Sequence, residues 1–134
     1  MKVRKTAEIV IGVLYAIGAA HQAFFVLPES TQFYVTMAAQ AWIRPAQVFV
    51  EEFLVPNSTI VTVLVVGFEA TLAITILSRG SAVRWALVAG GVFSVAGALT
   101  GSPAETLGFG LLAAIHFWLA RERWDRSAPA ETAS

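Results

Sequence analysis

The chain has 134 residues, enough for one compact domain, and 57% of them are hydrophobic whereas only 13% are charged. The charged share is roughly half that of a soluble domain, whose core at this size could not bury so much apolar surface. The absence of cysteines excludes disulfides and cysteine-ligated metals, and the net charge of zero, without any basic block, gives nucleic acid nothing to bind.

The hydrophobic residues form four runs, each near the ~20 residues that a helix needs to cross ~30 Å of hydrocarbon. The sequence therefore predicts an all-α fold, a membrane-embedded four-helix transmembrane bundle that forms a single domain over residues 1–126. We expect the spans at about 7–27, 58–78, 82–100 and 103–120. The residues after 120 are polar and are expected to be frayed, with 127–134 as a tail.

Local signals mark three of the span boundaries. Pro28, followed by an acidic residue, predicts the end of the first span, and Arg79 with Gly80 predicts the end of the second. Ser102-Pro103-Ala104-Glu105 is a capping box with proline at the first helical position, so it predicts the start of the fourth span.

The basic residues predict the orientation, because Lys and Arg near span ends are retained on the cytoplasmic side. With the N-terminus inside, only Arg44 of the nine basic residues lies outside. The others are Lys2, Arg4, Lys5, Arg79, Arg84, Arg121, Arg123 and Arg126. We therefore expect a multi-pass protein of the cell membrane with both termini cytoplasmic. A cleaved signal peptide over residues 1–20 is the alternative, but the apolar run continues through Leu27.

Residues 30–55, between the first two spans, alternate aromatic and aliphatic side chains with polar ones on each side of Pro45. This pattern predicts one or two short amphipathic helices in the outer interface. They would form either a lid packed on the bundle, which we favour, or a gate for a substrate or partner.

Three ionisable residues within the spans, His21, Glu69 and His116, are candidates to bind a ligand or line a polar cavity, since a charge at the bilayer centre is costly. Above the inner edge of the membrane, straight helices place Glu69 at roughly 13 Å, His21 at roughly 21 Å and His116 at roughly 6 to 8 Å. Side chains lean toward the helix N-terminus, so His21 and Glu69 point at one another and are predicted to pair.

The other interpretations of these residues are structural. Glu69 could be a neutral carboxyl that holds helices together, and His116 is expected to be an interfacial histidine. The difference in depth between the two histidines argues against a shared haem, and the spans offer no metal-ligand spacing.

Small residues recur in the third span at intervals suited to helix packing. We expect Gly90, Ser94, Gly97 and Gly101 to pack there, and Gly18 to allow close approach in the first span. Their partner is either another helix of this chain or a second subunit.

The chain resembles the DoxX-like family of small four-span membrane proteins. The resemblance rests on Gly12 and Gly18-Ala19-Ala20-His21 in the first span, where the family tends to have lysine in place of His21, and on Glu69-Ala70-Thr71-Leu72-Ala73 in the second. It implies subunits associated with quinone-linked oxidation of sulfur compounds, partners of membrane redox complexes, or an assembly chaperone. Quinone is implied as a ligand by this resemblance alone, and the residues themselves predict no cofactor.

The leading hypothesis is an accessory or assembly subunit of a membrane complex, with a redox complex as the particular case, and the protein is expected not to be catalytic on its own. Its expected partners are the lipid bilayer and a protein partner or a second copy. The alternative is a small proton-coupled carrier in which Glu69 titrates.

Overall fold

The computed structural model describes residues 2–127, and every regular element in this range is a helix. The long helices are α1 (Lys2–His21), α4 (Ser58–Ser78), α5 (Val83–Thr100) and α6 (Pro103–Ser127), and the short helices α2 (Ser30–Gln40) and α3 (Arg44–Phe49) lie between α1 and α4. Four helical stretches are long and apolar enough to cross a membrane, namely Lys2–Gln40, Ser58–Ser78, Val83–Thr100 and Pro103–Arg126. The predicted all-α fold with four spans is confirmed.

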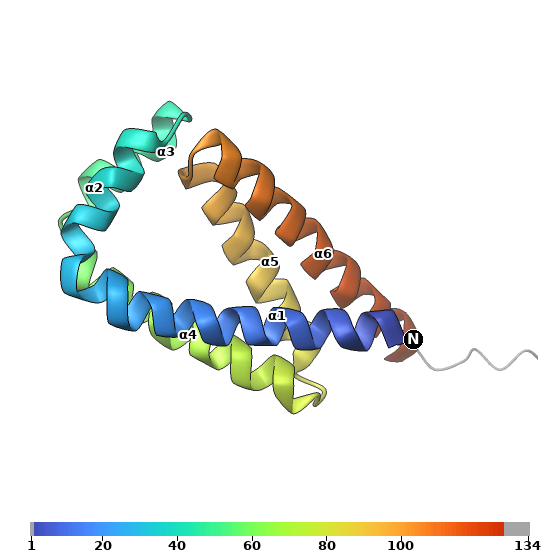
Figure 1. Ribbon diagram of the computed structural model, residues 1–134. Coiled ribbons are helices and arrows are strands. Elements are labelled where there is room, and N and C mark those ends of the chain that lie inside the picture. Colours follow the sequence, from blue (N-terminus) through green and yellow to red (C-terminus); the bar gives the residue numbers. More distant parts are fainter. Residues whose placement is uncertain (1, 128–134) are drawn as a thin grey trace, which may run out of the picture.

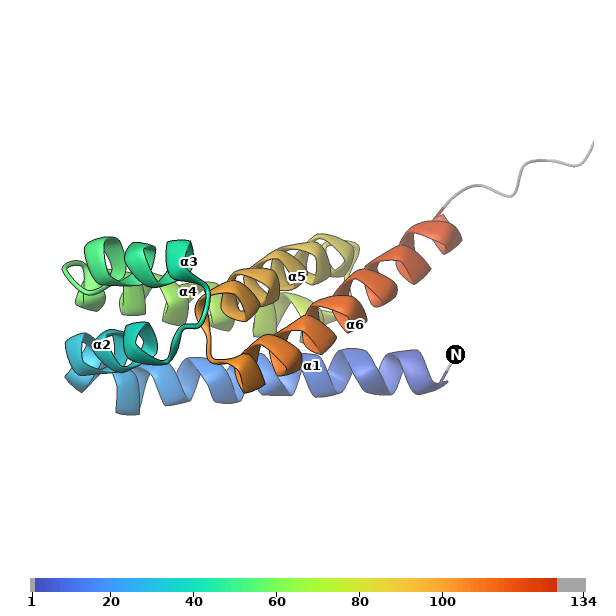
Figure 2. The same ribbon diagram turned by 90° about the horizontal axis from the view of Figure 1, so that it is seen from above.

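The long helices associate as two antiparallel pairs, α1 with α4 and α5 with α6 (Figure 1). The pairs approach each other near the N-terminus of α1 and diverge toward the other end, where α2 and α3 lie across the wide side (Figure 1). Seen from above, α2 and α3 lie over the ends of α1 and α4, and α6 extends beyond the other helices toward the C-terminus (Figure 2). The basic ends of α1 and α6 therefore lie at the same end of the molecule.

The buried core lies where the two pairs meet, and outward faces carry large apolar side chains. Ile76, Leu87 and Leu119 are almost completely buried in this core. By contrast, Leu107 is 78% exposed and Phe24 is 74% exposed. Lipid tails are as apolar as these side chains, so a membrane accommodates such outward faces at little cost.

The first span does not end at Pro28, contrary to the prediction. After α1 the chain continues through the π-helix η1 (Gln22–Val26) and the 3-10 helix η2 (Leu27–Glu29) directly into α2. Pro28 occupies the start of the 3-10 turn, where its missing N–H costs no hydrogen bond. The proline therefore marks a change of direction between two joined helices, which is visible where α1 meets α2 (Figure 1).

The segment 30–55 forms short helices as predicted, but they separate at Ala41–Ile43 and not at Pro45, which lies in the first turn of α3. A π-helical turn, η3 (Val50–Leu54), follows α3. Trp42 donates its indole N–H to Oγ1 of Thr106 at 2.9 Å, and that hydroxyl donates to the carbonyl of Ala98. The α2–α3 turn is thus fastened to the adjoining ends of α5 and α6, as a lid would be.

The remaining boundaries agree with the sequence except at the C-terminal end. The backbone N–H of Ser102 donates to Glu105 Oε2 at 2.7 Å, which confirms the capping box at the start of α6. The left-handed residue after α4 is Arg79, with φ 58°, and not Gly80. The expected fraying after residue 120 is wrong, because α6 continues to Ser127; residues 128–134 of the predicted tail lie outside the described range.

Candidate functional site

A cavity of about 230 Å³ lies between the two helix pairs and brings together polar side chains from all four long helices. Its polar lining consists of Tyr15, Glu69, Ser94 and His116. The rest of the wall is apolar and consists of Ile11, Leu14, Phe93, Phe109 and Leu112. A mainly apolar wall with a few convergent polar groups is the usual character of a small-molecule site.

Glu69 supplies the one carboxyl of this cavity. The residue is only 8% exposed, and its Oε2 atom is buried without a hydrogen-bond partner. Gly18 of α1 faces it closely enough that a Cβ atom at position 18 would lie 3.0 Å from Glu69 Oε1. Gly18 therefore makes room for the carboxyl, and the buried oxygen is left able to bind a ligand atom.

Tyr15 and His116 form a hydrogen-bonded pair on the same cavity. The Tyr15 hydroxyl lies 2.8 Å from His116 Nε2, and His116 Nδ1 lies 2.7 Å from the Leu112 carbonyl oxygen. Because a carbonyl only accepts, Nδ1 carries a proton; in a neutral imidazole Nε2 is then the acceptor, and the Tyr15 hydroxyl donates to it. The pair thus holds the tyrosine oxygen in a fixed position on the cavity wall.

The predicted pairing of His21 with Glu69 is wrong. His21 is exposed and stacks on Phe25, with ring centroids 5.6 Å apart. Along straight helices His21 and Glu69 differ in depth by roughly 8 Å. Although the two side chains lean toward each other, this lean is too small to close that gap. The residue at the level of the carboxyl is instead Gly18, one turn closer to the N-terminus of α1.

His116 is not an interfacial histidine, contrary to expectation. Its side chain is fully buried and lies on the same cavity as Glu69, although no hydrogen bond joins the two. The sequence predicts that the fourth span ends near Ala120, and this end places His116 close to the inner edge of the membrane. Because α6 runs to Ser127, His116 lies roughly 16 Å from the end of its helix and reaches the middle of the bundle.

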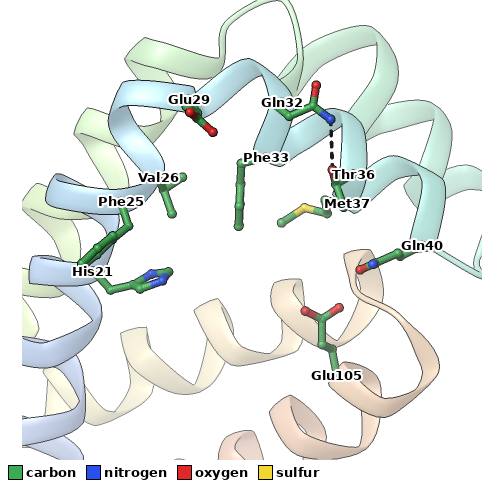
Figure 3. Close-up of a pocket in the computed structure, with 10 residues that line it drawn as sticks. All are labelled: His21, Phe25, Val26, Glu29, Gln32, Phe33, Thr36, Met37, Gln40 and Glu105. Carbon is green, nitrogen blue, oxygen red and sulfur yellow. Dashed lines mark hydrogen bonds between the residues drawn. The ribbon is translucent and has the colours of Figure 1, made fainter.

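A second cavity, of about 310 Å³, lies beneath the short helices and is more polar (Figure 3). His21 and Glu105 extend toward it from opposite sides, from the end of α1 and the start of α6 (Figure 3). Gln32 and Gln40 of α2 also line it. The structure therefore divides the predicted site residues, with Glu69 and His116 in the central cavity and His21 in the outer one.

The small residues of α5 pack within the chain. A Cβ at Gly90 would lie 2.5 Å from the Tyr15 hydroxyl, and one at Gly97 would lie 3.0 Å from the Phe109 ring. A Cβ at Gly101 would meet the Glu105 side chain at 2.7 Å. The fourth of these small residues, Ser94, is buried on the cavity wall and donates to the carbonyl of Gly90 at 2.8 Å. For these positions the packing partner is another part of the same chain, mainly α6.

Two residues with defined roles were not anticipated. Tyr15 had no charge to mark it, although its spacing from Ile11 and Ala19 places all three on one helical face. Glu8, 4% exposed, accepts two hydrogen bonds of 2.8 Å from Arg123. The sequence does contain a signal for this ion pair. One acidic residue lies one turn after the basic N-terminal residues, and arginines follow the last span.

The central cavity offers one carboxyl that can accept or, when protonated, donate a hydrogen bond, and one tyrosine hydroxyl held by His116. This set suits a small ring that bears both an apolar surface and oxygen or hydroxyl groups. No protein-family model, curated protein or solved structure matches this chain.

Proposed function

We propose that this multi-pass membrane protein is an accessory subunit of a membrane redox complex and that its central cavity binds the head group of a quinone-class ligand. The observation that carries this proposal is the buried, unpartnered Oε2 of Glu69 on the wall of a largely apolar cavity. Buried polar atoms in native proteins nearly always have a partner, so a ligand is a natural occupant.

The size and composition of the cavity support this ligand class. Its volume of about 230 Å³ lies below the ~300–1,000 Å³ of drug-sized sites, which favours a single substituted ring. Phe93 and Phe109 offer faces for an aromatic ring, while Glu69 would accept from a quinol hydroxyl or, when protonated, donate to a quinone oxygen. The DoxX-like resemblance supports the same class independently of the cavity.

The distribution of charge supports the proposed membrane orientation. The cavities at one end are lined by basic residues of α1, the α4–α5 turn, α5 and α6, while Arg44 lies in α3 at the lid. Under the positive-inside rule the basic end faces the cytoplasm. The termini would then both be cytoplasmic, and the outer cavity beneath α2 would face the opposite side.

Ligand binding is tested with the purified protein in lipid nanodiscs by equilibrium dialysis against a short-chain benzoquinone. We expect saturable binding that Glu69→Gln weakens at least tenfold. Glu51→Gln serves as the matched control, because Glu51 is exposed on η3 and does not line the central cavity. Equal binding by wild type, Glu69→Gln and Glu51→Gln would contradict a quinone site at Glu69.

The subunit role is tested separately by co-purification in mild detergent at native expression levels. We expect an oxidoreductase subunit to accompany the protein. Recovery of the protein alone, in a strain where the whole membrane fraction is solubilised, would count against an accessory role while leaving the ligand site intact.

A proton-coupled carrier is the second candidate, favoured by cavities that contain an ionisable side chain at three levels of the bundle. The outer cavity contains His21, the central one contains Glu69, and a third of about 320 Å³ at the basic end contains Glu8. In reconstituted vesicles a carrier would couple solute flux to protons, and Glu69→Gln would abolish that coupling. Unchanged proton-linked flux in Glu69→Gln would exclude the carrier mechanism.

A further inference from the structure

Arginines from both helix pairs converge at the basic end of the bundle. A cavity of about 260 Å³ there is lined by Arg4, Ser81, Arg84, Arg123 and Arg126. These residues come from α1, the α4–α5 turn with the start of α5, and α6, so the fold assembles the site from three distant parts of the sequence. The lining contains no carboxylate and no apolar side chain.

The nearby carboxylates only partly neutralise this arginine cavity. Glu8 binds Arg123 at 2.8 Å and lies 3.7 Å from Nε of Arg4, while Glu122 lies 3.3 Å from Arg126. Among the described residues, four guanidinium groups less these two carboxylates leave two positive charges. The cavity is therefore suited to an anion.

Two buried donors in the cavity wall lack acceptors. Nε of Arg4 and Nε of Arg84 are buried without a hydrogen-bond partner, and the 3.7 Å from Arg4 to Glu8 is too long for a hydrogen bond. The Arg84 guanidinium is held over the rings of Trp85 and Trp124, at 5.7 and 5.3 Å from their centroids. Positioned guanidinium groups with unused N–H donors match the oxygens of a phosphate.

The two tryptophans also indicate the depth of the cavity. Trp85 is 58% exposed and Trp124 is 36% exposed, and their rings meet edge to face at 5.0 Å. Tryptophan is enriched at the level of lipid head groups, where phosphodiesters lie. From the charge, the unfilled donors and this depth, we propose that the arginine cavity binds the phosphate group of an anionic phospholipid in the adjoining leaflet.

The experiment compares lipids by the thermal unfolding of the full-length protein in detergent. Phosphatidylglycerol is titrated against phosphatidylcholine at equal total lipid, and inorganic phosphate is added in a third arm. We expect a saturable rise in the unfolding temperature with phosphatidylglycerol only. An equal rise with phosphatidylcholine would overturn the proposal, and a full effect of inorganic phosphate alone would show that the site takes free phosphate instead.

Variants locate the site. Arg84→Gln and Arg126→Gln should each raise the half-saturating phosphatidylglycerol concentration roughly fivefold, the effect of one cation at a membrane surface. Among the ion pairs of the described residues, Arg126 pairs only with Glu122 of its own helix, and 43% of its side chain is exposed. Arg126→Gln therefore keeps the test valid even if Arg84→Gln fails to fold.

Arg121→Gln is the matched control, because Arg121 lies on the same helix with 82% of its side chain exposed and outside the cavity lining. It should leave the phosphatidylglycerol titration unchanged. If Arg121→Gln weakens the effect as much as Arg126→Gln does, the lipid is responding to the general surface charge and the proposed site is wrong.

Discussion

The hydroxyl of Tyr15 lies 2.8 Å from Nε2 of His116, and this buried hydrogen bond joins the first long helix to the last. Residues 101 positions apart are thereby fixed beside each other at the wall of the central cavity. The rings also meet edge to face, with centroids 5.6 Å apart. This contact couples the α1–α4 pair to the α5–α6 pair and holds one side of the candidate ligand site in place.

Tyr15→Phe removes this hydroxyl and leaves Nε2 of the buried His116 without a partner. The unsatisfied nitrogen should lower the free energy of unfolding by about 1–3 kcal/mol. Unfolding in mixed detergent micelles, followed by circular dichroism, measures the change. Thr71→Val is the control, because its exposed hydroxyl bonds only to the carbonyl of Gly67 on its own helix; equal stability of both variants would contradict a role for the Tyr15–His116 bond.

Gly90→Ala places a methyl group in the space that the side chains of Tyr15 and His116 occupy. The new Cβ would lie 2.5 Å from the Tyr15 hydroxyl and 2.7 Å from His116 Nε2, so the side chains must move. We expect a loss of about 1–3 kcal/mol in unfolding free energy, typical of overpacking. Gly110→Ala, which adds a methyl group with nothing within 4 Å, should be neutral or slightly stabilising. A Gly90→Ala variant as stable as Gly110→Ala would show that the helices are not in this close contact.

Glu8→Gln tests the ion pair at the basic end. The Glu8 side chain is 6% exposed and the Arg123 side chain is 20% exposed, so solvent screens their bond only in part. Removing the charge should cost about 1–3 kcal/mol, less than a fully buried pair because Arg123 reaches solvent. Asp125→Asn is the control, because it removes the ion pair between Asp125 and Arg121, whose side chains are both largely exposed. We expect no measurable change in the free energy of unfolding. Chemical denaturation in detergent distinguishes the two, and equal effects would contradict the account of Glu8 as a buried partner.

Trp42→Phe should loosen the lid without unfolding the bundle. The substitution removes the indole N–H that Thr106 accepts at 2.9 Å, while most of the aromatic surface remains. Hydrogen exchange of backbone amides in α2 and α3 should accelerate severalfold, since their attachment to α6 is lost, and exchange in α4 should be unchanged. Unaltered exchange in α2 and α3 would mean that this bond does not hold the lid.

The spans were predictable because hydrophobic length and capping chemistry are local properties of the sequence. The capping box at Ser102 to Glu105 and the end of α4 at Ser78 follow from a few neighbouring residues. The passage through Pro28 was not predictable in the same way. It follows a π-helical turn at Gln22–Val26, for which the sequence carries no local signal comparable to a capping box.

The candidate site was predictable in its main residue but not in its partners. Glu69 stood out because a carboxyl within a span is costly unless it is buried in the bundle. Its surroundings depend on the tilt and length of α6, which bring His116 to Tyr15. Depths counted along straight helices at 1.5 Å per residue do not reveal this tilt and length. Tyr15 carries a single hydroxyl on an otherwise apolar side chain, and the importance of that hydroxyl appears only when its partner His116 is known.

The most direct test of the central claim is an infrared difference spectrum of the protein in nanodiscs on addition of a short-chain benzoquinone. If the ligand binds at the carboxyl in the central cavity, a carboxyl band should shift in wild type and in Glu51→Gln and be absent from Glu69→Gln. A difference spectrum in which the same carboxyl band persists in Glu69→Gln, or in which none shifts in wild type, would contradict the account.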